Sequence, residues 1–174
     1  MVPAPVLALL SSAPAVGFSG SRSVAPAPTV VGALVAALPP GCSVSVGCAR
    51  GVDAAFRVAC PGAAVFRVAR GSGPSGFAAR SVACVRSVAP GGVWVSFPGG
   101  ACPPGLLPSP SSSRCFCGSR SGSWASLALA LGLGAVCLVL LPPGVVPPAG
   151  WGLVPLGGGW FRSAPVASSQ LALF

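Results

Sequence analysis

The chain has 174 residues and a formal net charge of +9, because ten arginines face a single acidic residue, Asp53. Its length fits one domain with one core, and its hydrophobic content of 53% excludes a disordered polar chain. The sequence has no histidine, lysine or glutamate. Histidine triads, histidine zinc ligands and paired-carboxylate chemistry are therefore excluded. One alternative stays open, that so biased a reading frame gives no stable protein.

The eight cysteines lie at irregular intervals without the paired C-x-x-C spacing of a zinc ribbon. They are Cys42, Cys48, Cys60, Cys84, Cys102, Cys115, Cys117 and Cys137. We expect core and loop thiols, with a metal site or disulfide around Cys102, Cys115 and Cys117 as the alternative. The first ten residues are apolar but carry no basic residue, which argues against a signal peptide. The expectation is a reduced, cytoplasmic protein without a metal or a cofactor.

Apolar runs separated by glycine and proline predict five strands that alternate with four helices. The predicted strands are 15–18, 43–46, 63–68, 93–97 and 135–141. The predicted helices are 27–38, 52–60, 77–88 and 125–133. In the third of these helices we expect Phe77, Val82 and Val85 to face the core. Arg80 and Arg86 are expected to be exposed cations, with a ligand-facing position as the alternative.

Short connections between strands and helices imply parallel strands with right-handed crossovers. The strands are uniformly apolar, as expected for a sheet with helices on both faces. We therefore predict an α/β fold, a Rossmann-like three-layer α/β/α domain over 14–144 whose sheet has five or more mainly parallel strands. Residues 1–13 are predicted to be a flexible N-terminal segment, and 145–174 a tail that packs on the domain or stays loose.

Two further segments carry predictions. The stretch 101–120 is longer than an ordinary connection and is rich in proline, serine and cysteine. Such a loop is usually mobile or part of a site. The stretch 124–141 is apolar and about long enough to suggest a membrane span. We favour a helix-to-strand turn at Gly132 and Gly134, and keep a small membrane protein as the alternative.

The segment 44–53 combines a β-branched run, a turn with two glycines and a helix start. The first backbone N–H groups of a helix have no partner within it, so this order predicts an anion site. Asp53 lies in the first helical turn, where a negative charge suits the helix dipole. We expect it to pair with Arg50 or Arg22, with a ribose hydroxyl as the alternative partner.

Three other turns also follow strands or open helices, and parallel strands bring such turns to one edge of the sheet. Glycine lets backbone N–H groups approach phosphate oxygens, which favours a phosphate cradle over ordinary turns. The candidate ligand-binding and phosphate-binding residues are Gly20, Ser21, Arg22, Gly47, Ala49, Arg50, Gly51, Asp53, Pro98, Gly99, Gly100, Gly122 and Ser123. No catalytic residue and no metal ligand is assigned.

Three motifs in this order resemble the SLOG superfamily, which includes DprA (Smf) proteins and the LOG (lonely guy) phosphoribohydrolases. They are Gly17-Phe-Ser-Gly-Ser-Arg22, Gly47-Cys-Ala-Arg-Gly-Val-Asp53 and Phe97-Pro-Gly-Gly100. The Ala49–Asp53 stretch looks most like the corresponding Ala-Arg-Gly-Ile-Asp of DprA. The resemblance covers 15–141. It implies that the turns after the first, second and fourth predicted strands, which carry the three motifs, face a nucleotide-like ligand.

The resemblance implies a protein that binds a nucleotide or a nucleotide derivative without catalysis. A DprA-like single-stranded DNA binder is one alternative, since an arginine-rich chain attracts nucleic acid through charge. LOG enzymes carry a glutamate after their Pro-Gly-Gly motif, and this chain has none. The missing glutamate argues against a nucleotide N-glycosidic hydrolase, which stays as the enzymatic alternative. A homodimer is a further possibility.

Overall fold

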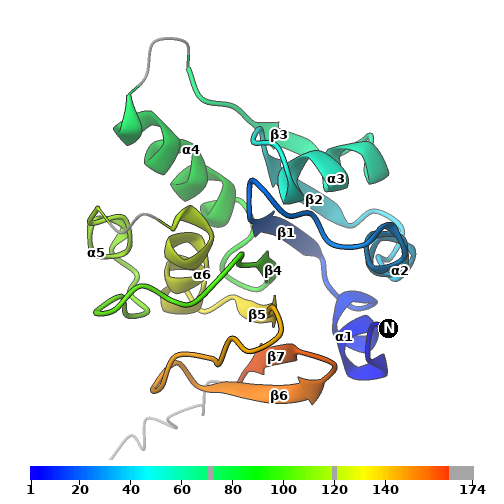
Figure 1. Cartoon of the computed structure of the whole chain (residues 1–174). Coiled ribbons are helices and arrows are strands. Elements are labelled where there is room, and N and C mark those ends of the chain that lie inside the picture. The colour runs from blue at the N-terminus through cyan, green and yellow to red at the C-terminus, as the bar shows by residue number, and fades with distance from the viewer. Residues whose placement is uncertain (70–72, 119–120, 165–174) are drawn as a thin grey trace, which may run out of the picture.

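The structure is a computed structural model that describes residues 1–69, 73–118 and 121–164 (Figure 1). Within these residues it is an α/β fold of six helices and seven strands. The helices are α1 (Ala4–Leu10), α2 (Pro28–Ala36), α3 (Val52–Ala59), α4 (Pro74–Arg86), α5 (Ser112–Cys115) and α6 (Gly122–Gly132). The strands are β1 (Ala15–Gly20), β2 (Ser43–Gly47), β3 (Ala64–Phe66), β4 (Val93–Phe97), β5 (Val136–Leu140), β6 (Leu153–Gly157) and β7 (Trp160–Ser163).

The strands of the described residues form one mixed, mostly parallel sheet in the order β3-β2-β1-β4-β5-β7-β6. The five strands from β3 to β5 are parallel, and β7 runs antiparallel to both β5 and β6. The chain builds outward from β1 to β3 on one side and then returns to place β4 on the other side of β1. Strand order therefore reverses between β1 and β4, where ligands bind in many open α/β sheets.

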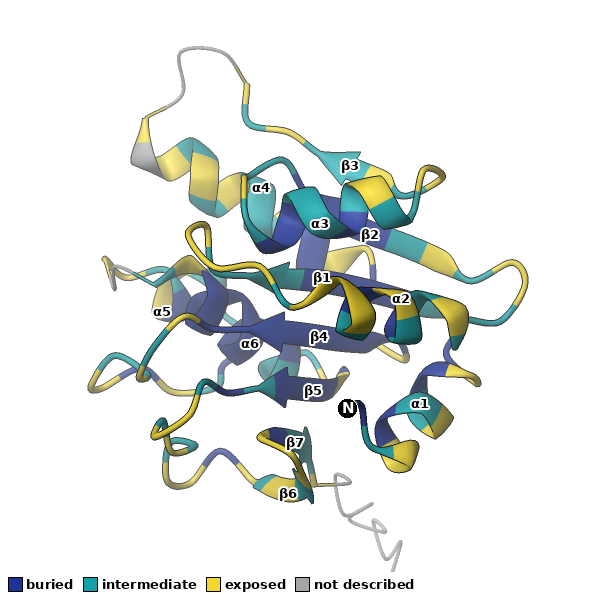
Figure 2. Cartoon of the chain, turned by 45° about the vertical axis from the view of Figure 1, so that its right-hand side comes forward, coloured by how far each residue is buried: buried dark blue, intermediate teal, exposed yellow. Residues whose placement is uncertain are grey.

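Side chains on alternate positions of the strands point to opposite faces of the sheet. Val16 and Phe18 of β1 belong to a core that includes residues of α1, α2 and α3. The other face has its own core, where Trp94 of β4 packs with residues of α4 and α6. A Cβ on Gly17 would overlap the Trp94 ring, so glycine is required where that indole crosses β1. Figure 2 shows that the central strands are buried while the outer faces of the helices are exposed.

The N-terminal segment differs from its prediction. Proline and alanine in 1–13 suggested a poorly ordered stretch, but Ala4–Leu10 forms α1. Val6 and Leu10 are completely buried in the core beside α2. A proline in the first turn is compatible with a helix, because the N–H that it lacks would have no partner there.

The apolar stretch 124–141 is divided between α6 and β5, as the two glycines favoured. No helix in the described ranges is long and apolar enough to cross a membrane. In the tail, β6 and β7 extend the sheet beyond β5, and residues 165–174 lie outside the described residues. In the 101–120 stretch, α5 and the buried residues Leu106 and Cys115 pack beside α6, while 119–120 lie outside the described residues.

Candidate ligand-binding cleft

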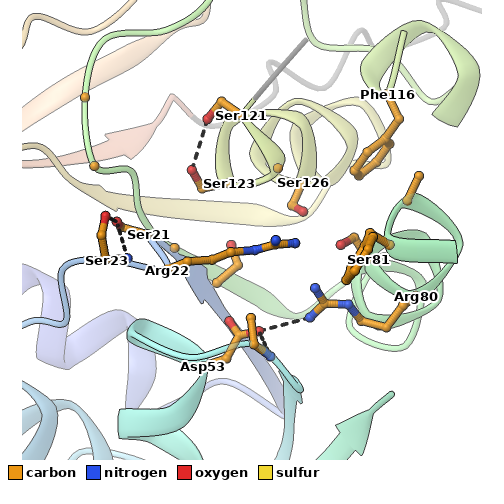
Figure 3. Close-up of a pocket in the computed structure, with 18 of the residues that line it drawn as sticks. Ser21, Arg22, Ser23, Asp53, Arg80, Ser81, Phe116, Ser121, Ser123 and Ser126 are labelled. Atoms are coloured by element: carbon orange, nitrogen blue, oxygen red, sulfur yellow. Dashed lines mark hydrogen bonds and ion pairs between the residues drawn. The ribbon is translucent and has the colours of Figure 1, made fainter. Parts of the chain in front are cut away.

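A cleft of about 800 Å³ lies at the carboxyl ends of β1 and β4, where strand order reverses. Its walls are the loop after β1, the loop after β4, and the N-terminal parts of α4 and α6 (Figure 3). Serine and glycine make up much of its lining, together with the side chains of Asp53, Arg22 and Arg80. Each wall comes from a different part of the chain, so the fold is what assembles the site.

The structure brings most of the predicted site residues to this cleft. Those that line it are Gly20, Ser21, Arg22, Ala49, Asp53, Gly99, Gly100, Gly122 and Ser123. Those that do not are Gly47, Arg50, Gly51 and Pro98. Pro98 instead lines a second, mainly apolar cavity of about 600 Å³, which shares Ser21 and Gly99 with the cleft.

Asp53 forms a buried ion pair with Arg80, in contrast to the expected partners Arg50 and Arg22. Arg80 Nη1 lies 2.9 Å from Asp53 Oδ2, and the two side chains are 9% and 7% exposed. The same carboxylate oxygen accepts a hydrogen bond from the Ala49 N–H at 3.1 Å. Arg80 was predicted to be an exposed or ligand-facing cation, with the exposed position favoured. It is instead largely buried and lines the cleft, because α4 places it against the only acid of the chain. Arg50 is exposed and lies outside the cleft.

The turn between β2 and α3 is held in place by a residue that the sequence did not single out. Arg57 Nη1 donates to the carbonyl oxygens of Gly47 and Ala49, both at 2.8 Å. Gly47 lies directly against the ion pair, since a Cβ there would overlap Arg80 Nη1 and Asp53 Oδ2. The one available signal was that Arg57 lies one helical turn after Asp53, on the same side of α3.

At the start of α3, where segment 44–53 predicts an anion site, the first backbone N–H is already engaged. The Val52 N–H donates to the Ser21 carbonyl oxygen at 3.0 Å. Gly51 has φ of +72°, and a Cβ there would overlap that same carbonyl. This glycine therefore lets the loop after β1 pack against the start of α3, and the turn supports the cleft wall.

The start of α6, in contrast, faces the cleft. Ser121, Gly122 and Ser123 line it, and the first hydrogen bond within the helix runs from the Ala125 N–H to the Ser121 carbonyl. The earlier N–H groups of a helix have no partner within it and attract anions, aided by the helix dipole. Trp124 Nε1 donates to the Gly100 carbonyl at 2.9 Å, which ties α6 to the loop after β4.

Arg22 reaches from the loop after β1 into the cleft (Figure 3). Its guanidinium carbon lies 4.9 Å from the ring centre of Phe77, which belongs to α4. Phe77 is 42% exposed, so the prediction that it faces the core is wrong. Phe116, from the loop after α5, points into the same cleft.

Two buried polar atoms of the cleft lining have no hydrogen-bond partner in the described part of the chain. They are the Ser19 hydroxyl and Arg80 Nε. A buried polar atom without a partner costs free energy, so the fold leaves these two groups beside the cleft unsatisfied.

The cysteines form no alternative site among the described residues. All eight are free thiols, which rules out the disulfide alternative in this structure. Residues 1–69, 73–118 and 121–164 hold no group of three or more histidine, cysteine or acidic side chains that could bind a metal ion. The groups that the cleft offers are hydroxyls, backbone N–H groups and guanidinium groups, a donor set suited to anions.

Comparisons with protein-family models, with curated proteins and with solved structures found no match to this chain.

Proposed function

We propose that this chain binds a nucleotide or a nucleotide derivative in the cleft, in a Rossmann-like three-layer fold of the SLOG type. The observation that carries the proposal is that the loops after β1 and β4 and the start of α6 line one cleft. These three segments are far apart in the sequence, and each supplies glycine or serine to the lining. A phosphate group between them would accept hydrogen bonds from N–H and hydroxyl groups and would lie near Arg22.

The contacts of Asp53 favour binding without catalysis. The carboxylate already accepts hydrogen bonds from Arg80 and from the Ala49 N–H. A general base must be free to take a proton from the substrate, and the Arg80 guanidinium already occupies this carboxylate oxygen. Without a second acid in the sequence, hydrolysis of an N-glycosidic bond has no acid and base pair.

The experiment is calorimetric titration of the full chain with adenosine 5′-monophosphate, using Gly122→Asp as the test variant. A Cβ on Gly122 meets no atom of the described residues within 4 Å, so the variant keeps the fold. The added carboxylate lies at the start of α6 and repels a phosphate, so we expect affinity to fall by about tenfold or more.

Gly32→Asp is the matched control, because it adds the same charge to α2, at a position that is open among the described residues and does not line the cleft. It should bind adenosine 5′-monophosphate like the natural chain. Equal loss of affinity in both variants would mean that net charge alone attracts the nucleotide. No binding by the natural chain would overturn the proposal.

Binding of single-stranded DNA is the second candidate, and the charge of +9 favours it. A strand held in the cleft should bind more tightly than duplex at physiological salt and should compete with adenosine 5′-monophosphate. Equal binding of both forms that disappears with added salt would reduce this to counterion release. A fluorescent thymidine oligonucleotide and its duplex, titrated at two salt concentrations, distinguish these outcomes.

A further inference from the structure

Phe77 is an aromatic side chain that core packing does not explain. It lies near the start of α4 and is 42% exposed, whereas Val85 of the same helix is completely buried. It lines a cleft whose other side chains are mostly polar. Exposed phenylalanine beside arginine and serine is a common arrangement for stacking a nucleobase.

The neighbours of Phe77 on α4 suit the edge of such a base. Arg80 and Ser81 lie three and four residues further along, on the same side of the helix, and both line the cleft. Within the described residues, Arg80 Nε is a buried donor without a partner. Adenine carries ring nitrogens in its plane that accept hydrogen bonds from guanidinium and hydroxyl groups.

The face of the Phe77 ring is covered by Arg22, 4.9 Å from the guanidinium carbon to the ring centre. Both residues are exposed, and an exposed cation–π contact is weak. The Arg22 side chain, on the loop after β1, can therefore leave the Phe77 ring at little cost in free energy. The start of α6, where the proposed phosphate lies, is on the other side of Arg22 from the Asp53–Arg80 pair (Figure 3).

We propose that Phe77 is the stacking platform for the nucleobase, and that Arg22 exchanges the ring for the phosphate when the nucleotide binds. The base takes the place of the guanidinium on the ring, with its edge toward Arg80 and Ser81. The released guanidinium pairs with the phosphate at the start of α6. This inference rests on the proposed function and specifies the ligand class as a complete nucleoside phosphate.

The test compares two probes, adenosine 5′-monophosphate and ribose 5-phosphate, which differ by the base alone. Calorimetry on the full chain measures the affinity of each for the natural chain, Phe77→Ala and Phe77→Leu. We expect both variants to lose about tenfold or more in affinity for adenosine 5′-monophosphate, and to bind ribose 5-phosphate unchanged. Phe77→Leu keeps an apolar side chain without an aromatic face, so it separates stacking from general apolar contact.

The control is Val58→Ala on α3, since Val58 is 84% exposed and lies outside the cleft.

Phe77→Trp restores an aromatic face at this position and reports binding of the base through tryptophan fluorescence. The four natural tryptophans are at most 5% exposed, so the added indole contributes a separate, solvent-exposed emission that the base should quench. Ribose 5-phosphate should not quench it.

The possible outcomes distinguish failure of the Phe77 platform from failure of the proposed nucleotide binding. If both probes bind the natural chain equally and Phe77→Ala changes neither, the base platform is wrong and the phosphate site stands. If Phe77→Ala weakens both probes to the same degree, Phe77 supports the cleft wall and the platform is again wrong. If neither probe binds the natural chain, the proposed function and this inference fail together.

Discussion

Asp53 is the residue on which the wall of the cleft depends. It accepts from Arg80 and from Ala49, while Arg57 fixes the neighbouring carbonyl groups. Removing one partner of a buried ion pair leaves the other charge without compensation, which costs far more than the pair itself contributes. The pair is therefore better understood as a device that fixes the turn than as a large source of stability.

We predict that Asp53→Ala lowers the free energy of unfolding by about 3–5 kcal/mol, because the Arg80 guanidinium stays buried and unpaired. The double variant Asp53→Ala with Arg80→Met should recover part of that loss, since no charge then remains in the wall. Urea denaturation of the natural chain, both single variants and the double variant measures the coupling. Additive losses would show that the two side chains act independently.

Two glycines of the cleft should respond differently to the same substitution. A Cβ on Gly20 would lie 2.6 Å from the Phe97 carbonyl oxygen and 2.6 Å from Val52 Cγ2, whereas one on Gly100 meets no described atom within 4 Å. Gly20→Ala should therefore destabilise the fold by about 1–3 kcal/mol through overpacking, and Gly100→Ala should have little effect. Thermal unfolding of both variants checks this, and equal melting temperatures would contradict it.

At the level of residues, the sequence could predict which small residues gather at the cleft and could not predict its ion pair. Glycine and serine after strands follow from chain order alone, and most of them do line the cleft. The partner of Asp53 depends on how α4 is positioned over β2, which no local pattern encodes. With ten arginines available, the residue type gave no help in choosing Arg80.

At the level of elements, α1 is an integral part of one core. Leu10 is completely buried, while Leu107, in the loop after β4, is 64% exposed. We predict that Leu10→Ala lowers the free energy of unfolding by about 2–5 kcal/mol and that Leu107→Ala changes it by less than about 0.5 kcal/mol. Urea denaturation measures both. A Leu10→Ala variant as stable as the natural chain would mean that α1 is dispensable.

The five parallel strands and four of the helices were predictable because each carries an apolar run that ends at glycine or proline. The pattern failed for α1, since prolines and alanines within a short stretch look the same in a loop and in a first helical turn. It also failed for the orientation of Phe77, because α4 carries few apolar residues at its start and its helical period gives no unique inner face. The hairpin of β6 and β7 was left open, since its glycines suited a loose tail equally well.

At the level of the whole molecule, two buried thiols lower the free energy of unfolding as pH rises in the alkaline range. Burial raises the pKa of Cys84 from 9.0 to about 12, with Asp53 nearby adding to the rise and Arg80 opposing it. Burial also raises the pKa of Cys137. Above pH 9 the unfolded chain loses these protons while the folded chain keeps them, so the folded state becomes less favoured as pH rises.

We therefore predict that the free energy of unfolding falls between about pH 9 and pH 12, with a slope of up to about 1.4 kcal/mol per pH unit for each thiol. Cys84→Ala and Cys137→Ala should each remove one part of that slope. Urea denaturation across this pH range provides the measurement. A slope that is the same in the natural chain and in the double variant would exclude the thiols as its cause.

The burial of Asp53 also has a consequence for self-association. Because the sequence has no other acidic side chain, two copies of this protein cannot form reciprocal salt links between side chains across a dimer interface. Each copy carries +9, so the copies repel one another in solution. Raising the ionic strength screens that repulsion, and association of the chain with itself should strengthen with salt where most polar interfaces would loosen.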